Sequence, residues 1–181
     1  MKRKKASTQK LLDGILYLLF VVTAMFLLLQ FVGQRTTVKG SSMEPALSQG
    51  DQILIDKLSY HFKEPERFDI VVFRKNEENF FYIKRIIGLP GEHVQISREG
   101  DIYIDGRILE EYYGKERMIY QGLAETEIIL GADEYFVLGD NRNESMDSRY
   151  EEVGTVKKSE IVGHAALRLY PMDAVGSLEN Q

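Results

Sequence analysis

Three segments of this chain stand out for their residue types, and the first of them, 40–47, reads GSSMEPAL and contains Ser42. A serine hydroxyl is a weak nucleophile until a neighbouring base removes its proton. The segment is also typical of a serine-rich turn closed by a proline, so a structural role is the alternative. A catalytic role therefore requires a base from elsewhere in the chain.

Lys84 is the candidate base. It lies in segment 82–92, YIKRIIGLPGE. Alternate side chains of a strand share a face, so we expect Lys84 beside Tyr82 and Ile86, with Arg85 on the opposite face. Burial among apolar residues disfavours the ammonium and lowers the pKa of a lysine, which can then act as a general base near neutral pH. The alternative is that one of these basic side chains extends from a core strand to solvent.

A third polar segment, 139–149, reads GDNRNESMDSR and follows a predicted strand. Asp147 and Arg149 are spaced to share one side of an extended segment, where a charge-assisted pair would hold the loop rigid. A simple turn or a calcium loop is the alternative. The EF-hand spacing is not met, because the expected glycine and distal glutamate are missing.

Composition and motifs exclude several other classes. The chain has 181 residues and no cysteine, which excludes a disulfide scaffold, a cysteine-ligated zinc site and a cysteine nucleophile. It contains no GxSxG, HExxH or P-loop motif. The three histidines (His61, His93 and His164) lie in unrelated contexts, so nothing favours a Ser-His-Asp triad. The net charge of −5 argues against a nucleic-acid partner.

The elements that must position these residues read mainly as short strands. β-Branched and aromatic runs, separated by Gly and Pro, predict strands at 52–56, 69–73, 81–87, 93–97, 101–104, 134–138 and 161–169. Residues 98–100 predict a hairpin, and Asp105-Gly106 predicts a second turn. Charge-dense stretches such as 150–158 are most simply solvated loops. The predicted fold class is mainly β, a compact barrel-like antiparallel sheet domain behind one N-terminal transmembrane helix.

The N-terminal segment 14–32 contains no charged residue, and at 1.5 Å per residue its length is close to the apolar thickness of a bilayer. Residues 1–34 carry a net charge of +4 (five Lys/Arg against Asp13), so residues 35–181 carry −9. The positive-inside rule then predicts a cytoplasmic basic tip (1–13), a membrane anchor (14–32) and an extracytoplasmic catalytic β-domain (33–181). A cleaved signal peptide is the alternative, but the apolar run is long and no Ala-x-Ala follows it.

Taken together, these segments resemble the bacterial type I signal peptidases, membrane-anchored serine proteases of the secretion pathway. The resemblance covers nearly the whole chain. It rests on the anchor, the Ser-Met-x-Pro segment at 42–45, the DIVVF strand at 69–73, the YIKRIIGLPG segment at 82–91 and the GDNR…SMDSR loop, in the order of that family. The short body is similar to the compact forms typical of Gram-positive bacteria.

The resemblance implies roles for individual residues. Ser42 would be the nucleophile, with its backbone N–H in the oxyanion hole, and Lys84 the general base. Ser145 would hydrogen-bond and orient the lysine. The remaining motif positions would support the site (Asp147, Arg149, Tyr82 and Arg85) or contact substrate (Met43 and Pro45). Some family members have a second oxyanion donor, a hydroxyl two residues before the nucleophile; here that position is Gly40.

The resemblance also implies an activity, the removal of N-terminal signal peptides from secreted pre-proteins after small-x-small (Ala-x-Ala) sites. It implies no metal and no organic cofactor. The expected partners are secretory pre-proteins and the lipid bilayer. Apolar residues near the site (Met43, Leu47, Phe62 and Phe68) either dip into the lipid interface or pack in the core. A non-catalytic anchored β-module and a different Ser-Lys processing peptidase remain the alternative functions.

Overall fold

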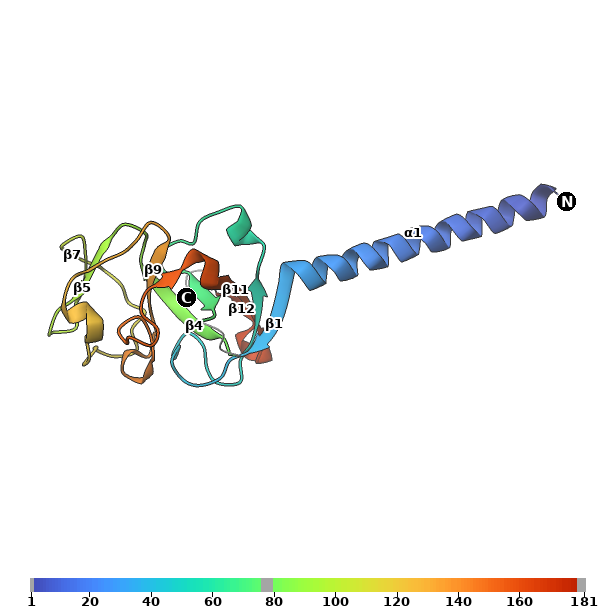
Figure 1. Ribbon diagram of the computed structural model, residues 1–181. Helices are drawn as coiled ribbons and strands as arrows, with labels where there is room; N and C mark the ends of the chain where they lie inside the picture. The colour runs from blue at the N-terminus through green and yellow to red at the C-terminus, as the bar shows by residue number, and fades with distance from the viewer. Residues whose placement is uncertain (1, 76–79, 179–181) are drawn as a thin grey trace.

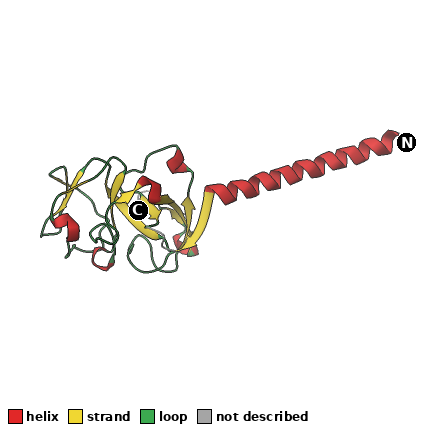
Figure 2. Cartoon of the chain, in the orientation of Figure 1, coloured by secondary structure: helices red, strands yellow, loops and turns green. Residues whose placement is uncertain are grey.

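The computed structural model describes residues 2–75 and 80–178, with the backbone alone for 2–9, 11 and 27–32. A single helix, α1 (Lys2–Val32), extends away from a β-rich body (Figures 1 and 2). The exposed side chains of α1 that are described include Lys10 at its polar end and apolar residues from Leu12 to Phe26. The chain passes from α1 into the first strand without a loop.

The larger sheet is antiparallel throughout and has the order β1-β2-β11-β3-β4-β9-β10, with β12 paired to β11. It curls into an open half-barrel, in which β1 and β10 are the two edges. Its strands are β1 (Gly33–Thr37), β2 (Gln52–Asp56), β3 (Ile70–Phe73), β4 (Tyr82–Gly88), β9 (Glu134–Leu138), β10 (Val156–Lys157), β11 (Ile161–Tyr170) and β12 (Gly176–Ser177).

A smaller antiparallel sheet of order β7-β6-β5-β8 is inserted between β4 and β9. Its strands are β5 (His93–Ile96), β6 (Ile102–Ile104), β7 (Arg107–Ile108) and β8 (Ile128–Ile129). It lies at the end of the body away from α1 (Figure 1). Short 3-10 helices connect the strands: η1 (Ser59–His61), η2 (Gly122–Glu125), η3 (Arg142–Glu144), η4 (Lys158–Glu160) and η5 (Met172–Ala174).

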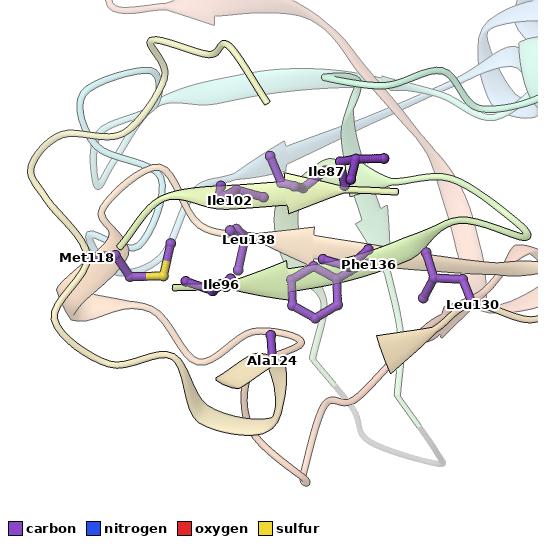
Figure 3. Packing of buried hydrophobic residues seen from close by; sticks show 10 residues of the cluster. Ile87, Ile96, Ile102, Met118, Ala124, Leu130, Phe136 and Leu138 are labelled. Carbon is purple, nitrogen blue, oxygen red and sulfur yellow. The ribbon is translucent and has the colours of Figure 1, made fainter. Parts of the chain in front are cut away.

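Three apolar clusters hold these layers together. One joins the small sheet to β4 and β9, where Ile96 and Ile102 meet Phe136 and Leu138 (Figure 3). A second packs Met43 and Leu47 against Ile53 and Ile70, beneath the segment that carries Ser42. The third surrounds Phe73, Ile86 and Tyr135 between β3, β4 and β9. Strands β4 and β9 contribute to two of the clusters and therefore form a rigid base for the polar segments that follow or face them.

The sequence predictions of the main strands are confirmed, and 52–56 and 134–138 agree at both ends. The predicted hairpin at 98–100 joins β5 to β6, and Asp105-Gly106 joins β6 to β7, with positive φ at both turn residues. The prediction that 150–158 is a solvated loop was wrong in part, because this segment contains β10 and the buried Val153 and Val156. Two-residue strands are too short to show a periodic pattern, so β7, β8, β10 and β12 escaped prediction.

The membrane span predicted at 14–32 falls on α1. Within the ranges that the structure describes, no helix is both long and apolar enough to cross a membrane, so the prediction of a transmembrane helix is not supported there. The predicted basic tip, 1–13, and the end of the span, 27–32, lie largely outside the described side chains.

Candidate active site

Ser42 lies on the loop that connects β1 to β2. The two ends of this loop are joined by Val38 N–H to Asp51 O (2.8 Å) and by Gly50 N–H to Val38 O (3.0 Å). Met43, directly after Ser42, is buried in the core. Gly40 has φ +84°, a left-handed conformation that favours glycine, and the space where a Cβ would lie is open. The loop is therefore packed on one side, while Ser42 itself stays partly exposed on the other.

Lys84 reaches Ser42 from the middle of β4. Its side chain is 4% exposed, and its Nζ lies 2.8 Å from Ser42 Oγ and 3.1 Å from the carbonyl oxygen of Ile83. Burial lowers the pKa of Lys84 to about 8, although the nearby carboxylates of Asp147 and Asp140 act in the opposite direction. The predicted burial of this lysine is confirmed. Arg85 is also buried (1% exposed), so neither side chain extends to solvent.

Ser42 and Lys84 lie in a cleft of about 630 Å³. One wall is the segment 36–43 and the other is 80–84, with Glu144 and Met146 at the end beside the Ser–Lys pair. Strand β1 pairs only with β2, and residues 82–84 of β4 pair with β3 but not with β9. Both walls thus present backbone edges that are not used in the described sheet.

Ser145 lies beside this pair but does not bond to it. Its Oγ is buried and has no hydrogen-bond partner among the described residues, so the expected hydrogen bond to Lys84 is not formed here. A Cβ at Gly139 would lie 2.2 Å from Ser145 Oγ and 2.4 Å from Ser42 O. Only glycine at position 139 allows Ser145 and the backbone of Ser42 to approach so closely.

Asp147 and Arg149 form the predicted pair, with both side chains buried. Arg149 Nε donates to Asp147 Oδ1 (2.8 Å) and Nη2 donates to Oδ2 (2.9 Å), a bidentate contact. Asp147 Oδ2 also accepts from the Gly139 N–H (3.1 Å), and Arg149 Nη1 donates to Tyr120 O (2.8 Å). The pair therefore ties the two ends of segment 139–149 together behind Ser145.

A second buried ion pair, which the sequence reasoning missed, lies on the other side of β4. Arg85 Nε and Nη2 contact Asp140 Oδ1 and Oδ2 at 2.8 and 2.6 Å, and the guanidinium stacks on the ring of Tyr113. Arg85 had been expected only to shape the site, and Asp140 had no role. The available signal was Asp140 in the polar segment, together with Arg85, whose neighbours two positions away in sequence are apolar. An arginine buried among apolar residues requires a charged partner.

Asn141 was also missed, although it connects the polar segment to the Ser42 loop. Its backbone N–H donates to Ser42 O (3.1 Å), and its side-chain Nδ2 donates to Ser41 O (3.1 Å). In the described part of the chain, the backbone N–H of Ser42 donates a hydrogen bond to no acceptor. The Ser42 carbonyl is thus held by Asn141, and the Ser42 N–H remains available as a donor.

Of the remaining predicted residues, Tyr82 and Met43 line the cleft and Pro45 does not. Tyr82 lines the cleft and stacks on Phe73, with 5.4 Å between ring centroids. Met43 lines the cleft from beneath, but Pro45 is exposed and is not one of the residues that line it. Met43 and Leu47 pack in the core, so the possibility that they dip into lipid was wrong. Phe62 is 83% exposed and does not pack in the core.

Comparison with known proteins gives consistent matches along most of the chain. Residues 11–170 match the family model described as "Signal peptidase, peptidase S26". "Probable signal peptidase I-2" from Synechocystis is 40% identical over 167 residues, which are 87% of this chain and 74% of that protein. "Signal peptidase I P" from Bacillus subtilis subsp. natto is 32% identical over 183 residues, 96% of this chain and 95% of that protein. A crystal structure of a signal peptidase I from Enterococcus faecalis is 36% identical, with a TM-score of 0.46, and the match covers 56% of this chain and 97% of that one.

Proposed function

Because the chain belongs to the signal peptidase family, peptidase S26, we propose that it removes N-terminal signal peptides from secretory pre-proteins by means of a Ser-Lys dyad. The family and the names of the relatives support the activity. The observation that supports the dyad is the 2.8 Å contact between Lys84 Nζ and Ser42 Oγ inside the cleft. The contact places Lys84 within hydrogen-bond reach of the Ser42 hydroxyl, and burial lowers its pKa. A general base requires both.

In the proposed acylation step, neutral Lys84 accepts the proton of Ser42 Oγ. The oxygen then attacks the carbonyl carbon of the scissile peptide, a recognised variant of the serine-protease plan. Lys84, now protonated, donates that proton to the leaving amine, and the C–N bond breaks. Water, deprotonated by the same lysine, hydrolyses the ester and restores the Ser42 hydroxyl.

The Ser42 N–H is the proposed oxyanion donor. Its freedom from other acceptors in the described chain supports this role. Loss of one such donor typically costs about 10²–10³ in rate. Gly40 offers no hydroxyl as a second donor, so a second hydrogen bond to the oxyanion would come from backbone or water.

Ser145, Asp147 and Arg149 have positioning roles in this proposal. The buried Asp147–Arg149 pair holds segment 139–149, and this segment in turn supports Ser145 and the carbonyl of Ser42. Ser145 Oγ would rotate to hydrogen-bond Lys84 once substrate occupies the cleft. Arg85, paired to Asp140, fixes the neighbouring position of β4.

The substrate is proposed to bind as an extended peptide between the two cleft walls. The edge of β1 away from β2, and residues 83–84 of β4, which do not pair with β9 in the described sheet, support this, since an added strand gains backbone hydrogen bonds on both sides. Small side chains one and three residues before the cut, as in Ala-x-Ala, would fit the cleft above Met43. Pro45 is not used in this arrangement.

Attachment to a membrane through α1 is a further part of the proposal. Its described apolar side chains are exposed on all sides and are covered by no other part of the described chain. Apolar surface of this extent is typical of contact with lipid or another protein. We place the basic tip in the cytoplasm and 33–181 outside the cell, in agreement with the charge of +4 before the body and −9 within it.

Incubation of the full-length protein in lipid or detergent with a purified pre-protein tests the proposed activity. We expect one cut after the Ala-x-Ala site, identified by mass spectrometry of both products, and no cut by the Ser42→Ala variant. A pre-protein left intact by folded wild type would contradict the activity and favour a non-catalytic module. A cut at a different type of site would favour a dedicated processing peptidase.

A further inference from the structure

Glu144 is a charged residue of the cleft for which the proposed mechanism has no use. It is the last residue of η3, directly before Ser145, and it lines the cleft at the end that contains the Ser42–Lys84 pair. Its side chain is exposed, and within the described residues its carboxylate forms no hydrogen bond or ion pair. Among the residues that line the described cleft, it is the one carboxylate.

The backbone that carries Glu144 is held firmly in place. Arg142 donates from Nη1 to Glu111 Oε1 (2.8 Å) and from Nε to Gly139 O (3.1 Å). Asn143 donates from Nδ2 to Arg117 O and accepts from the Ile119 N–H, both at 3.0 Å. The backbone of Glu144 is therefore fixed at the cleft, while its exposed side chain can still rotate.

The carboxylate of Glu144 acts on Lys115 only at longer range and forms no ion pair with it among the described residues. Lys115 is instead paired at 2.9 Å with Glu44, which lies two residues after Ser42. Besides Lys84, the cation that lines the cleft is Lys39, which lies on the wall formed by 36–43, three residues before Ser42. The cleft thus has a positive charge along the wall formed by 36–41 and a negative charge beyond the Ser–Lys pair.

The connection to α1 indicates which part of a substrate meets which charge. Thr36 lines the cleft and follows Val32, the last residue of α1, by four positions, a path of at most about 14 Å. If α1 lies in the membrane, the membrane-bound signal peptide enters the cleft at this wall. The residues after the cut then leave past Ser42 toward Glu144.

We propose that Glu144 determines the charge preference for the first residues after the cut, favouring lysine or arginine there and disfavouring aspartate or glutamate. This inference rests on the proposed function and deepens it. The carboxylate is solvent-exposed, and exposed ion pairs are weak, so we expect a two- to fivefold effect on kcat/KM per charge, which is roughly the size measured for such pairs. Salt at about 1 M should remove most of it, because the Debye length falls to about 3 Å.

The test uses full-length protein in detergent and two peptides that share one Ala-x-Ala site and differ in lysine or glutamate at the second position after the cut. Wild type should cleave the lysine peptide two- to fivefold faster in kcat/KM. Glu144→Gln should bring the ratio of the two rates close to one, and Glu144→Lys should invert it. Glu151→Gln, which removes an exposed carboxylate outside this cleft, is the control for net charge and should leave the wild-type ratio unchanged.

An unchanged ratio in both Glu144 variants would overturn the inference and leave the proposed function intact. Equal loss of the ratio in Glu151→Gln would also overturn it, because the effect would then come from overall charge. Failure of wild type to cut either peptide, while a pre-protein is also left intact, would contradict the proposed function itself.

Discussion

At the scale of single residues, the site depends on a lysine that a sheet holds away from water. Lys84 is 4% exposed in the middle of β4, with Ser42 Oγ as the side-chain partner of its Nζ. Desolvation favours the neutral amine, which lowers its pKa to about 8 despite two nearby aspartates. In the proposed mechanism, a lysine in this state would accept the proton of Ser42 without help from histidine.

The pH dependence of cleavage follows from this pKa. Only neutral Lys84 can act as the base, so kcat/KM should fall about tenfold per pH unit below pH 8 and level off above it. Circular dichroism at each pH would control for unfolding. A rate that stays constant from pH 6 to pH 9 would show that no group of this pKa acts as the base.

Ser145 provides a second prediction at this scale. Its buried Oγ has no described partner, so Ser145→Ala should not lower the free energy of unfolding, yet it should reduce kcat about tenfold or more if Oγ orients Lys84 during turnover. The matched control is Ser148→Ala, because Ser148 Oγ accepts from the buried Val137 N–H at 2.9 Å. That variant should lose about 1 kcal/mol of stability. A Ser145→Ala variant with the kcat of wild type would contradict the proposed positioning role of Ser145.

Residue types and local spacing were enough to single out Lys84 and the Asp147–Arg149 pair, whereas the role of Ser42 was implied by the resemblance to the signal peptidases. Positions 147 and 149 are close in sequence, so an extended backbone brings them together on its own. The Arg85–Asp140 pair was missed because its partners are 55 residues apart and meet only when β4 pairs with β9. Asn141 was missed for the same reason, since its side-chain contact on the Ser42 loop lies 100 residues earlier in the chain.

At the scale of elements, segment 139–149 is a polar loop stabilised by buried charges rather than by apolar packing. Asp147→Asn would leave the Arg149 guanidinium buried without a carboxylate, and such a change typically costs about 3–5 kcal/mol. We expect the midpoint of urea unfolding to fall by a corresponding amount, with activity lost in proportion to folding. Glu152→Gln, an exposed acid, should leave the midpoint unchanged. Normal unfolding combined with absent activity in Asp147→Asn would contradict a role through stability.

The elements that the sequence predicted correctly are those with several β-branched or aromatic residues in succession, such as β2, β4 and β9. Their pattern reflects burial on one or both faces, which a single strand records in its own residues. The two-residue strands β7, β8 and β10 form through pairing with neighbouring strands, so their own residues carry little signal. For the same reason, the division into two sheets could not be read from spacing alone.

At the scale of the whole molecule, the chain combines an acidic β-body with a helix that extends away from it (Figure 1). The described apolar side chains of this helix are exposed. We expect the full-length protein to stay with cell membranes after carbonate extraction. A tag at its N-terminus should be accessible to protease only after the cells are opened, while the body should be accessible in spheroplasts. Release by carbonate, or a tag cleaved from outside, would contradict the proposed anchor or its orientation.

The central claim, that Ser42 and Lys84 act as one catalytic unit, is tested most directly by initial rates of pre-protein cleavage for Ser42→Ala, Lys84→Ala and the double variant. Residues that act as a unit are strongly non-additive, so each single variant should lose about a thousandfold or more, and the double variant should lose no more than either. Folded single variants that cleave at the wild-type rate would contradict the dyad.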